Sequence, residues 1–258
     1  MSTRPRPASK LGAMRTWGLA IWQRRHDPLW RSVGLLAALL VAALFAFAHI
    51  AEDYLTGDPI VRWDVHLAAW LHAHSSPWLV SIFEIVTNAG NTVFLAVVTA
   101  TAGVLLIRRR AVNEAALLVL AAIGIEIVNG GLKLLFHRPR PELAFIHLDT
   151  YSFPSGHAAS SVAIYGVLAF LLVRRRSWPA RAGVVSAAAV LVAVVGFSRL
   201  YLGAHYLSDV LAGFSLGAAW LFAWLVVFEL YGRRDFLPRL PTSVQRFLAR
   251  IGGWRRDA

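Results

Sequence analysis

Side chains suited to phosphate chemistry are concentrated in three short segments of this 258-residue chain. Residues 133–141 read KLLFHRPRP, residues 154–157 read PSGH, and residues 198–209 read SRLYLGAHYLSD. The segments supply cations that could hold an anion, imidazoles that could attack or transfer a proton, and a carboxylate that could orient an imidazole. We therefore expect phosphoryl chemistry if the three segments meet in the folded chain.

Five of these residues fit a site for the phosphate group. Lys133, Arg140 and Arg199 are three cations that would match a doubly charged anion. Ser155 and Gly156 precede an apolar stretch, so the free N–H groups and positive dipole end of a helix starting there would also face the anion. The glycine permits close approach of the backbone, and the serine hydroxyl can donate a further hydrogen bond.

The remaining polar residues of the segments suggest catalytic roles. His205 and Asp209 are four positions apart, which puts them on one face of a helix if a helix begins near His205. The carboxylate would fix one ring nitrogen and leave the other free to attack. His157 is then available to protonate the leaving alkoxide. His137 and Arg138 lie beside this cluster and could contact the substrate, contact lipid headgroups or be solvated.

Composition places the segments in a membrane protein. The chain is 57% hydrophobic and 16% charged, which is too little polar surface for a soluble domain of this length. Stretches of about 20 apolar residues can span a bilayer. We predict six spans, at residues 32–50, 88–107, 113–135, 157–173, 182–198 and 208–231. The expected fold class is all-α, a polytopic six-helix transmembrane bundle.

A short helix outside the apolar core is expected between the first two spans. Within residues 64–78 and just before them, Trp63, Leu67, Trp70 and Leu71 recur at helical spacing, which is typical of an interfacial helix. No repeat or linker divides the chain. We predict a basic cytoplasmic segment at 1–31, one phosphatase domain at 32–231 and a basic cytoplasmic tail at 232–258.

The basic residues predict an orientation in the membrane. All but five of the 26 lysines and arginines fall on one side of a six-span layout; the five are Arg62, Lys133, Arg138, Arg140 and Arg199. Cytoplasmic loops are enriched in basic residues, so both termini are expected in the cytoplasm. The three segments are expected on the outer, periplasmic or extracellular face of a bacterial inner membrane. The net charge of +12 is thus explained by this topology and by contact with anionic lipid headgroups, and it does not require binding to nucleic acid.

Three further observations bear on alternatives. The first basic stretch and the apolar run to Ala51 could be a signal peptide, although the run exceeds the usual length of about 7–15 residues. Cysteine is absent, which excludes disulfides and thiolate nucleophiles. Polar residues lie in or near the spans, where they favour interhelical hydrogen bonding over a transport pathway: Glu84, Asn88, Asn91, Glu126 and Asn129. Gly130 and Gly131 are predicted to allow close helix packing.

The three segments together resemble the type 2 phosphatidic acid phosphatase superfamily, which includes membrane lipid phosphatases and soluble vanadium haloperoxidases. The family signature is K-x6-R-P, then P-S-G-H, then S-R-x5-H-x3-D, and the chain matches every fixed position in order. Bacterial undecaprenyl-diphosphatase and phosphatidylglycerophosphatase B belong to its membrane branch. The resemblance covers only these segments, about 25 residues, but the three-part coincidence is very specific.

The resemblance implies a role for each matching residue. Phosphate would be bound by Lys133, Arg140, Ser155, Gly156 and Arg199. His205 would form a phosphohistidine with Asp209 as its partner, and His157 would protonate the leaving group and then activate water. No metal and no cofactor are implied.

The expected function is hydrolysis of a lipid phosphate or diphosphate, with undecaprenyl diphosphate, phosphatidylglycerophosphate and phosphatidic acid as candidates. The substrate is expected to be a lipid because the site lies at the membrane surface of a chain without a sizeable soluble domain. The alternatives are transfer of the phosphoryl group to another hydroxyl, transport of a lipid or ion, and halide oxidation, which the solubility of the haloperoxidase branch disfavours. The sequence leaves the oligomeric state open.

Overall fold

The computed structural model describes residues 28–57, 59–146, 148–174 and 176–231, and the regular structure of these residues is entirely helical. Its helices are α2 (Pro28–Thr56), α3 (Pro59–Ala73), α4 (Pro77–Thr87), the 3-10 turn η1 (Asn88–Gly90), α5 (Thr92–Arg108), α6 (Val112–Phe136), α7 (Gly156–Val173), α8 (Trp178–Tyr201) and α9 (Leu207–Tyr231). The predicted all-α class is confirmed. The predicted tail, and the N-terminal segment before Pro28, lie outside the described residues.

The membrane-spanning elements agree with the predicted count only when one broken span is included. Within the described residues, α2, α6, α7, α8 and α9 are each long and apolar enough to cross a membrane. The residues from Pro77 to Gly90 and those from Thr92 to Arg108 pass this test as a pair bent by 45°. The span predicted at 88–107 therefore has the wrong start: the side chain of Asn91 accepts a hydrogen bond from Val93 N at 2.8 Å and caps a new helix there.

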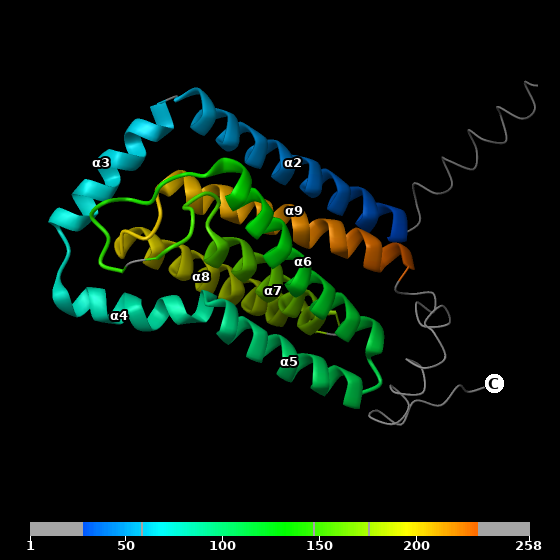
Figure 1. The fold of residues 1–258 in the computed structure, drawn as a ribbon. Coiled ribbons are helices and arrows are strands. Elements are labelled where there is room, and N and C mark those ends of the chain that lie inside the picture. The colour runs from blue at the N-terminus through cyan, green and yellow to red at the C-terminus, as the bar shows by residue number, and fades with distance from the viewer. Residues whose placement is uncertain (1–27, 58, 147, 175, 232–258) are drawn as a thin grey trace, which may run out of the picture.

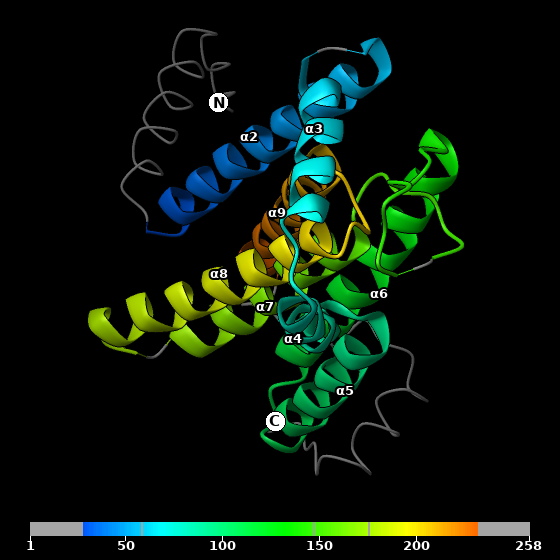
Figure 2. The same ribbon diagram turned by 90° about the vertical axis from the view of Figure 1, so that its left-hand side faces the viewer.

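Helix α3 begins and ends earlier than the predicted interfacial helix at 64–78. A turn follows it, and Pro77 starts α4, as proline commonly does in the first turn of a helix. Trp63 is 69% exposed, whereas Asp64 and Leu71 of the same helix are buried. Figures 1 and 2 show α3 lying across one end of the bundle.

Glycines bring the backbones of α7 and α9 together. A Cβ atom on Gly213 would lie 2.6 Å from the carbonyl oxygen of Ser155, and one on Gly217 would lie 2.4 Å from that of Ala159. Small residues four apart permit this close approach in membrane helices. The start of α7 is thereby held against the first half of α9.

The role predicted for Gly130 and Gly131 is wrong. A Cβ atom on either would have no neighbour within 4 Å, because this side of α6 faces open space. The close glycine contact of α6 is made instead by Gly124, where a Cβ atom would lie 2.2 Å from the ring of Trp220.

Interhelical hydrogen bonding is confirmed for Glu126. Its carboxylate accepts from Ser160 Oγ at 2.6 Å and from Thr92 Oγ1 at 3.3 Å, joining α6 to α7 and α5. Asn88 behaves differently, since its side chain donates to the carbonyl of Glu84 within its own helical segment.

The helices alternate in direction, so the α6–α7 loop and the α8–α9 turn lie at one end of the bundle together with α3. Figure 1 shows this end at the left. We call it the site end. The loops from α5 to α6 and from α7 to α8 lie at the opposite end.

Candidate active site

The three segments meet at the site end. Ser155, which precedes α7, donates its backbone N–H to the carbonyl of Asp209 on α9 at 2.9 Å. Ser152 donates likewise to the carbonyl of Arg138 at 2.8 Å. These bonds join the end of α6, the start of α7 and the start of α9 into one structure.

Two of the predicted phosphate-binding cations lie beside residues 150–152. Lys133, in the last turn of α6, donates from Nζ to the carbonyls of Tyr151 and Ser152. Arg140 donates from Nε to the carbonyl of Thr150 and from Nη1 to that of Ala204, both at 2.6 Å. Backbone carbonyls thus fix the direction of both side chains.

Arg199 and Ser155 offer donors that the protein does not use. Arg199 is buried, its Nη1 donates to Thr87 Oγ1 at 2.7 Å, and its Nε has no partner within the described part of the chain. The buried hydroxyl of Ser155 also lacks a partner among those residues. An unpaired buried polar group costs free energy, so these positions suit a ligand that accepts hydrogen bonds. Gly156 begins α7 beside them, where the free N–H groups of a helix start can also bind an anion.

His205 is oriented through its Nδ1 atom. Nδ1 lies 3.4 Å from Oδ2 of Asp209 and 3.4 Å from Oγ of Ser152, whose hydroxyl donates to the same carboxylate. Nε2 lies on the other side of the ring, 3.3 Å from Nη1 of Arg140. With the proton on Nδ1, the lone pair of Nε2 faces the cations.

Burial and charge keep this imidazole neutral. Burial first, and then the positive charges of Arg199, Arg140 and Lys133, lower the pKa of His205 well below its ordinary value of 6.5, and an interaction with the backbone of Ser152 opposes the shift. Burial also lowers the pKa of Arg140 below its ordinary value, against the opposing charge of Asp209. At neutral pH the unprotonated Nε2 thus faces the positive guanidinium of Arg140, an arrangement suited to attack on a phosphate bound there.

His157 lies in the first turn of α7, close enough to interact electrostatically with His205 and Arg199. The structure therefore brings together all eight residues predicted for catalysis and phosphate binding. His137 ends α6 in the left-handed conformation at φ 48°, and its exposed ring stacks edge-on against Tyr151 at 4.5 Å.

Arg138 has a different environment from the other cations. It is 3% exposed, and its guanidinium donates to Asp64, Ser208 and Asp209, each at 2.7 Å. The interpretation of Arg138 as a solvated or headgroup-contacting residue is wrong, because the side chain is turned into the protein.

Sequence reasoning missed Asp64, Ser152 and Thr87. Asp64 could have been found from its position, because this carboxylate shares a helical face with Leu67 and Leu71. The apolar face of a surface helix packs against the protein, so an acidic residue on it is unusual. Ser152 and Thr87 are common hydroxyl residues, and nothing in their spacing pointed to the site.

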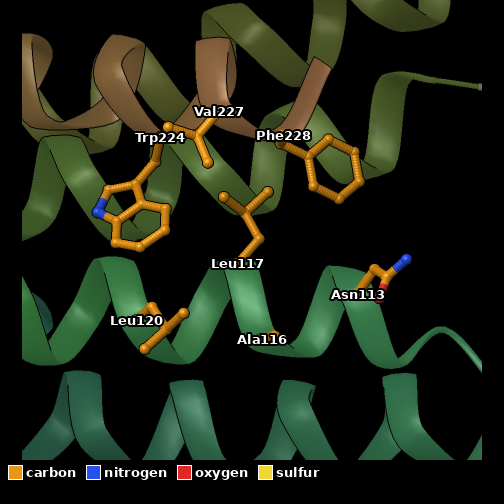
Figure 3. A pocket seen from close by; sticks show the side chains of 7 residues that line it. All are labelled: Asn113, Ala116, Leu117, Leu120, Trp224, Val227 and Phe228. Atoms are coloured by element: carbon orange, nitrogen blue, oxygen red, sulfur yellow. The ribbon is translucent and has the colours of Figure 1, made fainter. Parts of the chain in front are cut away.

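A small apolar pocket lies elsewhere, between the start of α6 and the end of α9. Figure 3 shows Leu117, Leu120 and Asn113 of α6 facing Trp224 and Phe228 of α9. The active-site residues lie at the other ends of these two helices.

Comparison with known proteins identifies the family. The family model of the PAP2 superfamily matches residues 114–233. Phosphatidylglycerophosphatase B of Bacillus subtilis (strain 168) is 36% identical over 147 residues, which are 55% of this chain and 71% of that protein. Decaprenylphosphoryl-5-phosphoribose phosphatase of Mycobacterium tuberculosis (strain H37Rv) is 38% identical over 92 residues, 34% of this chain and 46% of that protein.

A solved structure supports the same assignment. The crystal structure of a transmembrane PAP2-type phosphatidylglycerolphosphate phosphatase from Bacillus subtilis superposes with a TM-score of 0.65 at 29% identity. The match covers 77% of this chain and 98% of that one. The chain therefore belongs to the PAP2 superfamily and is an integral membrane lipid phosphatase, as its three segments predicted.

Proposed function

We propose that the protein hydrolyses a phosphate or diphosphate ester of a membrane lipid through a phosphohistidine on Nε2 of His205. The observation that carries this proposal is the fixed orientation of the ring. Asp209 and Ser152 engage Nδ1, which leaves Nε2 pointing toward Arg140. Nucleophilic catalysis by histidine needs this division between an oriented nitrogen and a free one.

The reaction proceeds in two displacements. Nε2 attacks phosphorus, the bond from phosphorus to the ester oxygen breaks, and His157 gives a proton to the departing oxygen. His157 then takes a proton from water, whose oxygen attacks the phosphohistidine, and the phosphorus–nitrogen bond breaks. The unused donors of Arg199 and Ser155, together with Lys133 and Arg140, hold the phosphoryl oxygens through both steps.

Phosphatidylglycerophosphate is the first substrate to test, because the Bacillus subtilis relative is a phosphatidylglycerophosphatase. Undecaprenyl diphosphate and phosphatidic acid carry the same phosphoryl group and follow it. Phosphate release from each purified lipid distinguishes them. If the substrate phosphate is labelled with ³²P, label that appears on an added lipid alcohol and not in inorganic phosphate would show that the protein is a phosphotransferase instead.

The active site faces the outside of a bacterial plasma membrane in this proposal. The described residues Arg108, Arg109, Arg110 and Arg174 lie at the end of the bundle opposite the site, as expected of the cytoplasmic side. The chain has no cysteine, so a single one can report its side of the membrane. An impermeant thiol reagent applied to intact cells should label Asp149→Cys at the site end and spare Arg109→Cys; the reverse pattern would overturn the orientation.

His205→Ala tests the nucleophile. This variant should release no phosphate and form no acid-labile phosphoenzyme. His66→Ala is a matched control, since His66 is an exposed histidine of α3 at the same end of the bundle. Phosphate release by His205→Ala at the rate of the control would exclude the mechanism.

A further inference from the structure

A buried chain of ion pairs joins α3 to the nucleophile's partner. Arg138 donates from Nη2 to Asp64 Oδ2 and from Nη1 to Asp209 Oδ1, both at 2.7 Å. Both carboxylates are fully buried. Asp64 lies on α3, outside the three segments that carry the site, so a helix from the first third of the chain reaches Asp209 through one guanidinium.

The geometry points to Asp64 as a positioning residue for phosphoryl transfer, acting through Arg138 on Asp209 and hence on His205. This inference rests on the proposed phosphohistidine mechanism. A planar guanidinium can hold two carboxylates in fixed directions, because its donors form a rigid fork. The rings of Tyr54 and Tyr206 lie 4.6 Å and 4.4 Å from the guanidinium carbon and restrict its plane further.

Asp64 also holds the start of α9. Its Oδ1 accepts from the backbone N–H of Ser208 at 2.9 Å, and its Oδ2 accepts from the Ser208 hydroxyl. A carboxylate at this position accepts a hydrogen bond from a free N–H group of the helix and interacts favourably with the positive end of the helix dipole. Asp64 therefore fixes both the backbone that bears Asp209 and the guanidinium that holds its side chain.

Loss of Asp64 should disturb catalysis more than phosphate binding. In Asp64→Asn, Nη2 of Arg138 loses its charged partner, and the guanidinium can turn with the carboxylate of Asp209. The Nδ1 contact of His205 then shifts, and a displacement of this kind far from phosphorus can slow a reaction by about 100-fold. None of the Asp64 contacts involves Lys133 or Arg199, so affinity for inorganic phosphate should remain within about threefold of wild type.

The experiment separates the two quantities. Phosphoenzyme formation is followed by rapid quench with the ³²P-labelled lipid phosphate that wild type turns over fastest, and inhibition by the product inorganic phosphate reports ground-state affinity. We expect Asp64→Asn to form phosphoenzyme about 100-fold more slowly with nearly unchanged inhibition by inorganic phosphate. Glu52→Gln, which alters an exposed carboxylate of α2, should match wild type in both.

A double-mutant cycle tests whether Asp64 acts through Arg138. In an Arg138→Gln background, Asp64→Asn should add little further loss, because the connection to Asp209 is already broken. Additive losses, or equal loss of rate and of affinity for inorganic phosphate, would overturn the inference. If Asp64→Asn does not fold, Asp64→Glu keeps the charge, displaces it by one methylene, and should show the same split.

The two proposals fail in different ways. A wild-type protein that turns over substrate without an acid-labile phosphoenzyme would remove the mechanism on which the inference rests. A wild-type protein that forms it, with Asp64→Asn equally fast, would leave the mechanism standing and exclude Asp64.

Discussion

His205 and Asp209 meet with Nδ1 3.4 Å from Oδ2, although His205 lies before the helix that carries Asp209. The backbone N–H of His205 bonds to the carbonyl of Arg199, which places the histidine in the turn after α8. The side chain of Asp209 accepts a hydrogen bond from the backbone N–H of Tyr206 at 2.9 Å, as acidic residues in the first turn of a helix often do. One carboxylate thus caps α9 and orients the imidazole.

Replacing Asp209 with Asn should slow phosphoenzyme formation and spare binding. The amide keeps the size of the carboxylate but removes the charge that favours a proton on Nδ1, so the ring loses its oriented tautomer. We expect a loss of between about 100-fold and 10,000-fold in the rate, with inhibition by inorganic phosphate little changed. Asp149→Asn, an exposed carboxylate at the same end, is the control. Parallel loss of both measurements would indicate a structural role for Asp209.

His157→Ala should accumulate phosphoenzyme when the leaving group needs no proton. With ³²P-labelled p-nitrophenyl phosphate, formation of the phosphohistidine does not need an acid and still proceeds. Its hydrolysis lacks the base that activates water, so acid-labile ³²P should build up on the protein. With a lipid phosphate the first step should slow by about 100-fold to 10,000-fold. Label that builds up no further than in wild type would contradict the assignment of His157 as the water-activating base.

The pH dependence of the enzyme should follow the charges around His205. Positive Arg140 lowers the pKa of His205, so removing this charge moves that pKa back toward 6.5 and leaves less neutral imidazole in mildly acidic solution. In Arg140→Gln the acid limb of kcat/KM, measured between about pH 4 and pH 8, should shift to higher pH.

The height of this profile also falls, because Arg140 binds phosphate in the proposal, but only the position of the limb tests the charge effect. Ionisation of the substrate is common to both proteins and cancels in the comparison. Arg109→Gln, at the opposite end of the bundle, should leave the limb in place. If the acid limb of kcat/KM in Arg140→Gln is unchanged or moves to lower pH, an effect of the Arg140 charge on the pKa of His205 is excluded.

The sequence predicted the helical class and the meeting of the three segments well because those features depend on local chemistry. Apolar length indicated the spans, and the alternation of helices put Lys133, Ser155 and Arg199 at one end. The break at Asn91 was missed because hydropathy averages over a window and does not register a cap.

The inner contacts of the site could not be predicted in the same way. Arg138 and Arg140 are both arginines of one short segment, and only the folded chain shows that the first faces Asp64 and the second faces His205. Which partner a side chain meets depends on helix packing, which residue type and spacing do not specify. Gly130 and Gly131 failed as a packing prediction for the same reason.

The glycine contact between α7 and α9 should be needed for both stability and turnover. In Gly213→Val the added Cβ would lie 2.6 Å from the carbonyl oxygen of Ser155 and 2.8 Å from Cβ of Ala158, so the helices must separate. Overpacking of this kind costs about 1–3 kcal/mol, and the thermal unfolding midpoint in detergent should fall. Because Ser155 N bonds to the carbonyl of Asp209, the separation should also widen the site and lower turnover of the protein that remains folded.

Gly131→Val is the matched control, since a Cβ atom there has open space within 4 Å on the same kind of helix. It carries the same β-branched side chain, so any intrinsic effect of valine on a helix is shared by the two variants. A larger drop in midpoint and turnover for Gly213→Val than for Gly131→Val would assign the difference to contact between α7 and α9. Equal drops would mean that valine itself, and not the packing of the site end, limits the fold.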